Sequence, residues 1–253
     1  MSIGTHLRRQ GGLLFRWRSI LPLLLLPPAL IALMHSDVLE ASFGERADDA
    51  WMISCLVVSF IGQAWRGLVV GSAPAGTSGR NTRAQRALTL NTTGAYSVSR
   101  NPLYFGNLLV IAGFALAIQV WWMTVIVILA FALYYERIIF AEEAYLEERF
   151  GESFRIWSAA TPLIFPRFSL WKPPALPFSL RIALRREYNG VALILITVPL
   201  IDFLRDVIAE GKTPVEWLRE DTAWALTAAV GVVLLLVFRA IKRHTRLLQV
   251  PGR

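Results

Sequence analysis

Six stretches of mostly apolar residues alternate with polar segments along the chain. Each is close to the length of a helix that crosses a bilayer, about 20 residues with a range of about 17 to 25. The first stretch is short and contains three prolines, so we expect it to be kinked or tilted. The six stretches are 20–34, 51–70, 103–118, 120–139, 188–204 and 222–241.

The third and fourth stretches are nearly continuous. Gln119 interrupts them, and Trp121 and Trp122 follow directly. Because tryptophan favours membrane–water interfaces, this break predicts a tight hairpin whose apex lies at an interface. We expect residues 136–150 to continue the fourth helix into water.

Composition supports a membrane protein. Of the 253 residues, 55% are hydrophobic and 17% are charged, whereas soluble domains carry about 25% charged residues. The sequence therefore predicts an all-α, polytopic helical membrane protein with about six transmembrane helices. The single cysteine, Cys55, and three scattered histidines provide no internal disulfide, no cysteine-based metal site and no histidine box. We expect no metal.

The distribution of charge predicts the orientation. Segments 1–18, 71–100 and 239–253 carry arginine or lysine and no acidic residue, whereas acidic residues predominate in 35–50 and 205–221. Since basic loops stay in the cytoplasm, both termini should be cytoplasmic, in a bacterial inner membrane. We interpret the basic N-terminus as preceding a retained first helix rather than a signal peptide. The same pattern accounts for most of the net charge of +8 without nucleic acid as a partner. The oligomeric state is left open.

Three parts of the chain can be distinguished. Residues 1–91 hold the first two spans and a glycine- and serine-rich cytoplasmic loop, and residues 92–170 hold the hairpin and the densest polar signals. Residues 171–253 hold a surface segment and the last two spans. The proline-rich stretch 162–177 should be a loop or a membrane-surface segment.

The first polar cluster leads directly into the third span, at residues 94–106. Pro102 suits the first turn of a helix, and Asn101 can cap that helix. Arg100 offers bidentate geometry for a carboxylate or phosphate. Gly94 and Gly106 allow close backbone approach. The segment could therefore bind an anionic group at a helix N-terminus.

The second polar cluster follows the fourth span and contains Glu142 and Glu143. Because the third and fourth spans form a hairpin, these carboxylates should return to the same side of the membrane as Arg100. A carboxylate there could bind ribose hydroxyls or an ammonium group, or favour the positive charge of a sulfonium. We therefore expect a cofactor site on the cytoplasmic face.

Together, Gly94-x-Tyr96-x-x-x-Arg100-Asn101-Pro102-x-Tyr104-x-Gly106 and Glu142-Glu143-x-x-Leu146-x-x-x-Phe150-Gly151 resemble the isoprenylcysteine carboxyl methyltransferase family, whose broader group includes the phospholipid N-methyltransferases. The resemblance covers residues 92–165. It implies S-adenosylmethionine as cofactor. It also implies cofactor-binding roles for Tyr96, Arg100, Asn101, Pro102, Tyr104, Gly106, Glu142 and Glu143. Asn101 replaces the family's usual histidine and cannot take up a proton near pH 7.

The expected reaction is O-methylation of a carboxylate or phosphate on a lipid or lipid-linked substrate. Such an acceptor is already anionic, so the enzyme mainly has to align the partners. We expect Arg100 and Glu143 to be catalytic, and Arg80 and Arg137 to bind substrate. An amine acceptor would instead need a base, for which Glu143 is the candidate.

Three alternatives stay open at the level of sequence. The chain could be a phospholipid N-methyltransferase. It could be an NADPH-dependent membrane reductase, with Arg80 and Arg83 near the 2′-phosphate. It could also be a non-enzymatic membrane protein whose basic face binds anionic lipid.

Overall fold

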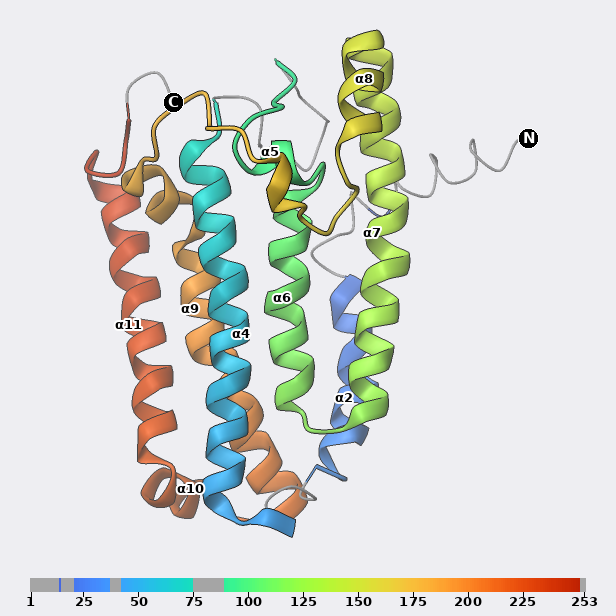
Figure 1. Cartoon of the computed structure of the whole chain (residues 1–253). Coiled ribbons are helices and arrows are strands. Elements are labelled where there is room, and N and C mark those ends of the chain that lie inside the picture. The colour runs from blue at the N-terminus through green and yellow to red at the C-terminus, as the bar shows by residue number, and fades with distance from the viewer. Residues whose placement is uncertain (1–13, 15–20, 37–41, 75–88, 251–253) are drawn as a thin grey trace.

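Five long helices run side by side in the computed structural model (Figure 1). It describes residue 14 and residues 21–36, 42–74 and 89–250. Helix α4 packs against α6 and α9, α11 packs against α9, and α7 follows α6 as a hairpin. The described part of the chain contains no β-strand, which confirms the all-α prediction. The long helices are α4 (Glu45–Ser72), α6 (Pro102–Ala117), α7 (Trp121–Phe150), α9 (Leu180–Arg205) and α11 (Thr222–His244).

Shorter elements occupy the two ends of this bundle (Figure 1). Near α5 lie α8 and the 3-10 turn η2, whereas α10 lies at the opposite end. A 3-10 turn, η1, leads into the short α2 beside α7. The bounds are η1 (Leu21–Leu25), α2 (Leu26–Leu33), α5 (Ala95–Val98), α8 (Glu152–Ala160), η2 (Phe168–Leu170), the π-helical turn η3 (Asp206–Glu210) and α10 (Pro214–Glu220).

Three described helices, α4, α7 and α11, are long and apolar enough to cross a membrane. Residues 23–33 and α6 are shorter apolar helices. Much of the apolar surface faces outward, as on α11, where Leu226, Val233 and Leu236 are about 60% exposed. Outward-facing apolar side chains over a whole helix are expected where lipid replaces water as the solvent.

The predicted hairpin is confirmed. Helix α6 ends at Ala117 and α7 begins at Trp121, with Gln119 between them in the left-handed region at φ 63°. Helix α7 continues to Phe150, as predicted, and therefore extends well past the first residue of α6.

Small residues bring α4 and α6 into backbone contact. A Cβ on Gly62 would lie 2.6 Å from the carbonyl oxygen of Gly106, and one on Gly113 would lie 2.6 Å from that of Cys55. A Cβ on Gly106 would lie 2.5 Å from Cγ of Arg66. Small residues commonly allow such close helix packing in membranes. Gly106 therefore has a packing role in the structure, and its predicted role at the cofactor remains a prediction.

A buried ion pair ties α4 to α9 at the end of the bundle near α10. The guanidinium of Arg205 donates to both carboxylate oxygens of Asp48, at 2.7 and 3.1 Å, and its side chain is 1% exposed. Asp202 accepts a hydrogen bond from the indole of Trp217 in α10. Gln119 donates to Asp48 and adds the α6–α7 turn to the cluster.

Candidate functional site

The segment before α6 is held by a second segment that crosses the end of the bundle. We call this second segment, residues 161–179, the strap (Figure 1). The hydroxyls of Ser97 and Ser99 also join the two segments, Ser97 accepting from Lys172 N and Ser99 donating to Ile164 O. The backbone hydrogen bonds run from Arg100 N to Pro162 O (2.8 Å), from Arg167 N to Val98 O (2.9 Å) and from Gly94 N to Lys172 O (3.0 Å).

Gly94 is required where the two segments pair. Its φ of +59° is in the left-handed region, and a Cβ there would lie 3.1 Å from Cβ of Pro174. Trp157 of α8 donates its indole N–H to the carbonyl of Tyr96. The strap and α8 therefore fix the backbone that carries Tyr96 and Arg100.

Arg100 and Glu143 meet, as the sequence analysis expected. The Nη1 atom of Arg100 lies 3.0 Å from Oε2 of Glu143, and the two side chains are 20% and 23% exposed. Nε of Arg100 and Oε1 of Glu143 are buried and have no hydrogen-bond partner among the described residues. Since buried polar atoms are nearly always paired, these two atoms are available to a polar ligand or to water.

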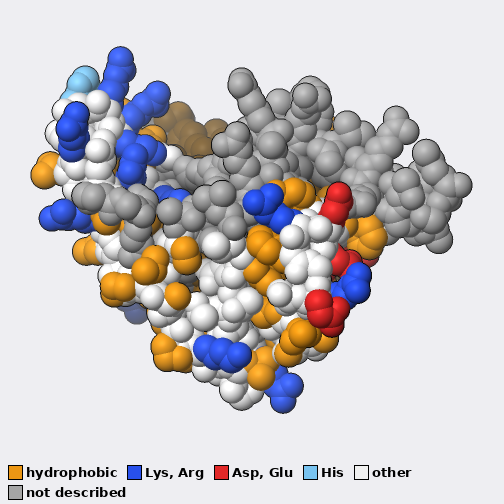
Figure 2. Space-filling view, turned by 90° about the horizontal axis from the view of Figure 1, so that it is seen from above, with side chains coloured by type: hydrophobic (Ala, Val, Ile, Leu, Met, Phe, Trp, Pro, Cys, Tyr) orange, Lys and Arg blue, Asp and Glu red, His pale blue; other side chains and the backbone are white. Residues whose placement is uncertain are grey.

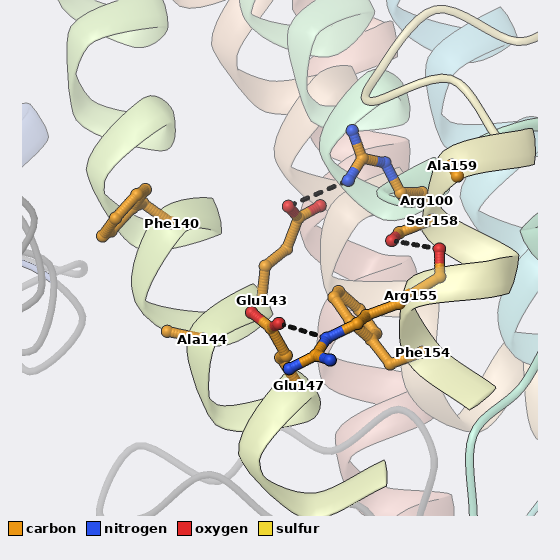
Figure 3. Close-up of a pocket in the computed structure, with 9 residues that line it drawn as sticks. All are labelled: Arg100, Phe140, Glu143, Ala144, Glu147, Phe154, Arg155, Ser158 and Ala159. Atoms are coloured by element: carbon orange, nitrogen blue, oxygen red, sulfur yellow. Dashed lines mark hydrogen bonds and ion pairs between the residues drawn. The ribbon is translucent and has the colours of Figure 1, made fainter. Parts of the chain in front are cut away.

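A cavity of about 370 Å³ opens beside this ion pair, between α7 and α8 (Figure 3). Ligand pockets have volumes of about 300 to 1,000 Å³. Phe140 and Phe154 give it apolar walls. At its rim Nε of Arg155 donates to Glu147 at 2.8 Å. The cavity thus combines apolar walls with four charged side chains.

Glu142 faces a different set of side chains from its neighbour Glu143. The phenol of Tyr104 lies 2.9 Å from both of its carboxylate oxygens. The rings of Tyr104 and Tyr135 lie 4.5 Å apart. Burial, and then the negative charge of Glu142, raise the pKa of the Tyr96 phenol. The two adjacent glutamates therefore belong to different polar clusters, Glu143 with Arg100 and Glu142 with Tyr104.

Asn101 and Pro102 begin α6, but only one of them acts as predicted. Pro102 stands in the first turn, as expected. The expected side-chain cap by Asn101 is wrong, because its amide instead donates to the carbonyl of Leu163 at 3.1 Å. The strap thus occupies the side chain that stands where the family has histidine.

Of the two arginines predicted to bind substrate, the structure describes one. Arg137 donates to the carbonyl of Leu133 and pairs with Glu136, and it does not line the cavity beside Arg100. Arg80 lies outside the described residues. Their roles toward a substrate remain predictions.

A buried polar network behind the site was not predicted from the sequence. Arg66 of α4 donates to both carboxylate oxygens of Glu187 in α9, each at 2.9 Å, and also to Asn107 of α6. Asn107 in turn donates to the phenol of Tyr135 at 3.0 Å. The signal in the sequence was an arginine inside the apolar stretch 51–70, since charged residues within membrane spans usually have a functional or pairing role.

The chain shares sequence with two curated relatives named as metal resistance proteins. It is 33% identical to the cobalt-zinc-cadmium resistance protein CzcN of Cupriavidus metallidurans over 135 residues, half of this chain and 56% of that protein. It is 32% identical to the nickel-cobalt-cadmium resistance protein NccN of Alcaligenes xylosoxydans xylosoxydans over 133 residues, 49% of this chain and 56% of that protein. The chain therefore spans little more than half the length of either.

No solved structure matches the chain. Among the residues that the structure describes, no group of three or more histidine, cysteine, aspartate or glutamate side chains is placed to hold a metal ion. Residues 76–153, which carry Arg100, Glu142 and Glu143, match the phospholipid methyltransferase family, part of the isoprenylcysteine carboxyl methyltransferase-like group.

Proposed function

We propose that this chain is an S-adenosylmethionine-dependent membrane methyltransferase that O-methylates a carboxylate or phosphate on a lipid or lipid-linked substrate. One observation carries the proposal. Within the family-matched residues, Arg100 and Glu143 come from segments 43 residues apart and pair at the edge of a cavity. Both side chains line that cavity, and each has one buried polar atom without a partner among the described residues that a ligand could use.

The residues present fit the proposed cofactor. The unpaired Nε of Arg100 can donate to a carboxylate, and the unpaired Oε1 of Glu143 can accept from an ammonium or a hydroxyl. The remaining holders would be the residues that the family resemblance marks. When bound, S-adenosylmethionine supplies a methyl group on a positively charged sulfur, which passes to the acceptor oxygen as the carbon–sulfur bond breaks. The proposed holders are Tyr96, Arg100, Asn101, Pro102, Tyr104, Gly106, Glu142 and Glu143.

Helix lengths support a site at the membrane surface. At 1.5 Å per residue, the 16 residues of α6 span about 24 Å and the 30 residues of α7 about 45 Å. Glu143 lies 22 residues after Trp121, about 33 Å along the axis, and a hydrocarbon core is about 30 Å thick. We therefore propose that Glu143 lies just outside the hydrocarbon.

The proposed topology keeps six crossings, formed by η1 with α2 and by α4, α6, α7, α9 and α11. From the charge pattern we propose that both termini and the site lie on the cytoplasmic side of a bacterial inner membrane. We propose that residues 92–170 form the methyltransferase core. Residues 1–91 and 171–253 would shape a lipid-accessible environment around it.

The ion pair favours an anionic acceptor. Burial raises the pKa of the Glu143 carboxyl, and the charge of Arg100 opposes that shift. Because Glu143 is paired with Arg100, it could take a proton from an ammonium group only by giving up this ion pair. A carboxylate or phosphate acceptor needs no such base and could use the fixed charge of Arg100 for alignment.

Phospholipid N-methylation is the second candidate, and the description of the matched family favours it. Under this alternative an amine acceptor would lose a proton before methylation, and Glu143 would have to be released from Arg100 to receive it.

The test is methyl transfer by purified protein in lipid nanodiscs. Labelled cofactor would be supplied with lipids that carry a carboxylate, a phosphate or a primary amine in otherwise matched bilayers. The proposal predicts label in a carboxylate or phosphate lipid, and loss of that label in Arg100→Gln but not in the exposed control Arg219→Gln. Label in the amine lipid alone would establish the second candidate instead. No transfer to any lipid by folded protein would contradict both.

A further inference from the structure

The strap presents large apolar side chains to its surroundings. The exposed fractions are 69% for Phe165, 63% for Phe168 and 50% for Trp171. Leu163 and Phe178, at the two ends of the strap, are also exposed. Soluble surfaces rarely keep such patches unless they bind a partner or a membrane.

Basic residues lie among these apolar side chains. Residues 153–186 contain six arginines and lysines and no acidic residue. Arg167 and Lys172, both exposed, lie within the strap, and Arg181 follows it. Figure 2 shows this end of the molecule, with basic and apolar side chains intermixed and acidic ones gathered on one side. The charge of the strap therefore complements an anionic surface.

The aromatic side chains of the strap continue the outer faces of two apolar helices. The Phe168 ring packs edge-on against Trp65 of α4 at 5.9 Å, and the Phe165 ring packs against Phe105 of α6 at 6.2 Å. Trp65 and Phe105 also contact each other at 6.0 Å. An aromatic belt with basic residues beside it is typical of the membrane–water interface, whereas a docking site for a soluble protein would be expected to face away from the lipid.

We propose that the strap docks onto anionic lipid headgroups, with its aromatic rings at the headgroup–acyl boundary and Arg167 and Lys172 on the phosphates. Because Pro162 and Leu163 hydrogen-bond to Arg100 and Asn101, docking also holds the candidate site at headgroup level. The inference rests on the proposed membrane placement and does not depend on methyl transfer.

The first experiment measures how deeply the strap lies in the bilayer. An environment-sensitive fluorophore would be attached at Phe168→Cys in a Cys55→Ala background, in nanodiscs containing lipids with nitroxide quenchers near the headgroup. The control is Ser153→Cys, an exposed position in α8 beyond the end of α7. We expect strong quenching at 168 and little at 153. Equal, weak quenching at both positions would overturn the proposal.

The second experiment measures how strongly the protein prefers anionic to zwitterionic lipid, and it needs no label on the protein. Short-chain phosphatidylglycerol and short-chain phosphatidylcholine would be titrated into the detergent-solubilised full chain. At about 1 kcal/mol for each basic side chain near an anionic surface, Arg167→Gln/Lys172→Gln should lower the preference for phosphatidylglycerol about 30-fold. Arg219→Gln, at the other end of the bundle, should leave it unchanged. An equal affinity of the unaltered protein for the two lipids would overturn the proposal. So would an unchanged preference in the double variant.

Discussion

Replacing Glu187 with glutamine tests the buried network that supports the site. Glu187 accepts two hydrogen bonds from Arg66 and one from Gln63. The side chains of Arg66 and Glu187 are 17% and 7% exposed, so this pair is more deeply buried than the pair in the candidate site. Glu187→Gln keeps the shape of the side chain but leaves the charge of Arg66 without its counter-ion.

The expected loss can be worked out from this geometry. Removing one partner of a fully buried ion pair costs about 3 to 5 kcal/mol, because the remaining charge stays desolvated. Since Arg66 keeps some exposure and its bond to Asn107, we expect the lower end, a loss of about 3 kcal/mol in the free energy of unfolding. Replacing both partners with apolar residues removes the unpaired charge and is often close to neutral, so Arg66→Met/Glu187→Met should recover most of that loss.

The assay is equilibrium unfolding of the purified protein in mixed micelles, followed by tryptophan fluorescence. Wild type, Arg66→Met, Glu187→Met and the double variant form a double-mutant cycle, which isolates the pairwise coupling. A loss below about 1 kcal/mol for Glu187→Gln would refute the reasoning, because such values are typical of exposed pairs. A double variant less stable than Glu187→Gln would also refute it.

Three further perturbations can be measured in the same unfolding assay. Gly106→Ala places a methyl group 2.5 Å from the nearest side-chain atom and should cost about 1 to 3 kcal/mol, whereas Gly67→Ala, with nothing within 4 Å, should be neutral or stabilising. Asp48→Asn removes the nearest counter-ion of Arg205 at the other end of the bundle, and Arg205 keeps the more distant Asp202 at 3.9 Å, so the cost should be about 3 kcal/mol; a cost near zero would contradict the role of that pair. Burial raises the pKa of Asp221 to about 6, above its value of about 4 in an unfolded chain. The folded protein therefore holds that proton more tightly, so stability should fall as the pH rises from about 4 to about 6, and Asp221→Asn should reduce this slope.

The sequence predicts the hairpin and the meeting of two polar segments because both follow from local signals. A polar break at Gln119 between two apolar stretches forces the chain to reverse. Reversal returns Glu143 to the level of Arg100 regardless of how the other helices pack.

Other features depend on tertiary packing and could not be predicted. Arg66 and Glu187 lie 121 residues apart, and neither position indicates its partner. Helix α9 begins at Leu180, eight residues before the predicted stretch at 188, and so contains the polar residue Glu187, whose partner Arg66 lies in another helix. Which of two adjacent glutamates faces Arg100 depends on the rotation of α7, which the sequence does not specify.

The cofactor site can be tested by calorimetric titration of S-adenosylmethionine into the detergent-purified protein, beside Glu143→Gln and the exposed control Glu152→Gln. We expect micromolar binding that Glu143→Gln weakens about 10- to 100-fold, the worth of one hydrogen bond to a charged group, and that Glu152→Gln leaves unchanged. No binding by folded protein, or equal binding by all three proteins, would contradict a cofactor site at Arg100 and Glu143.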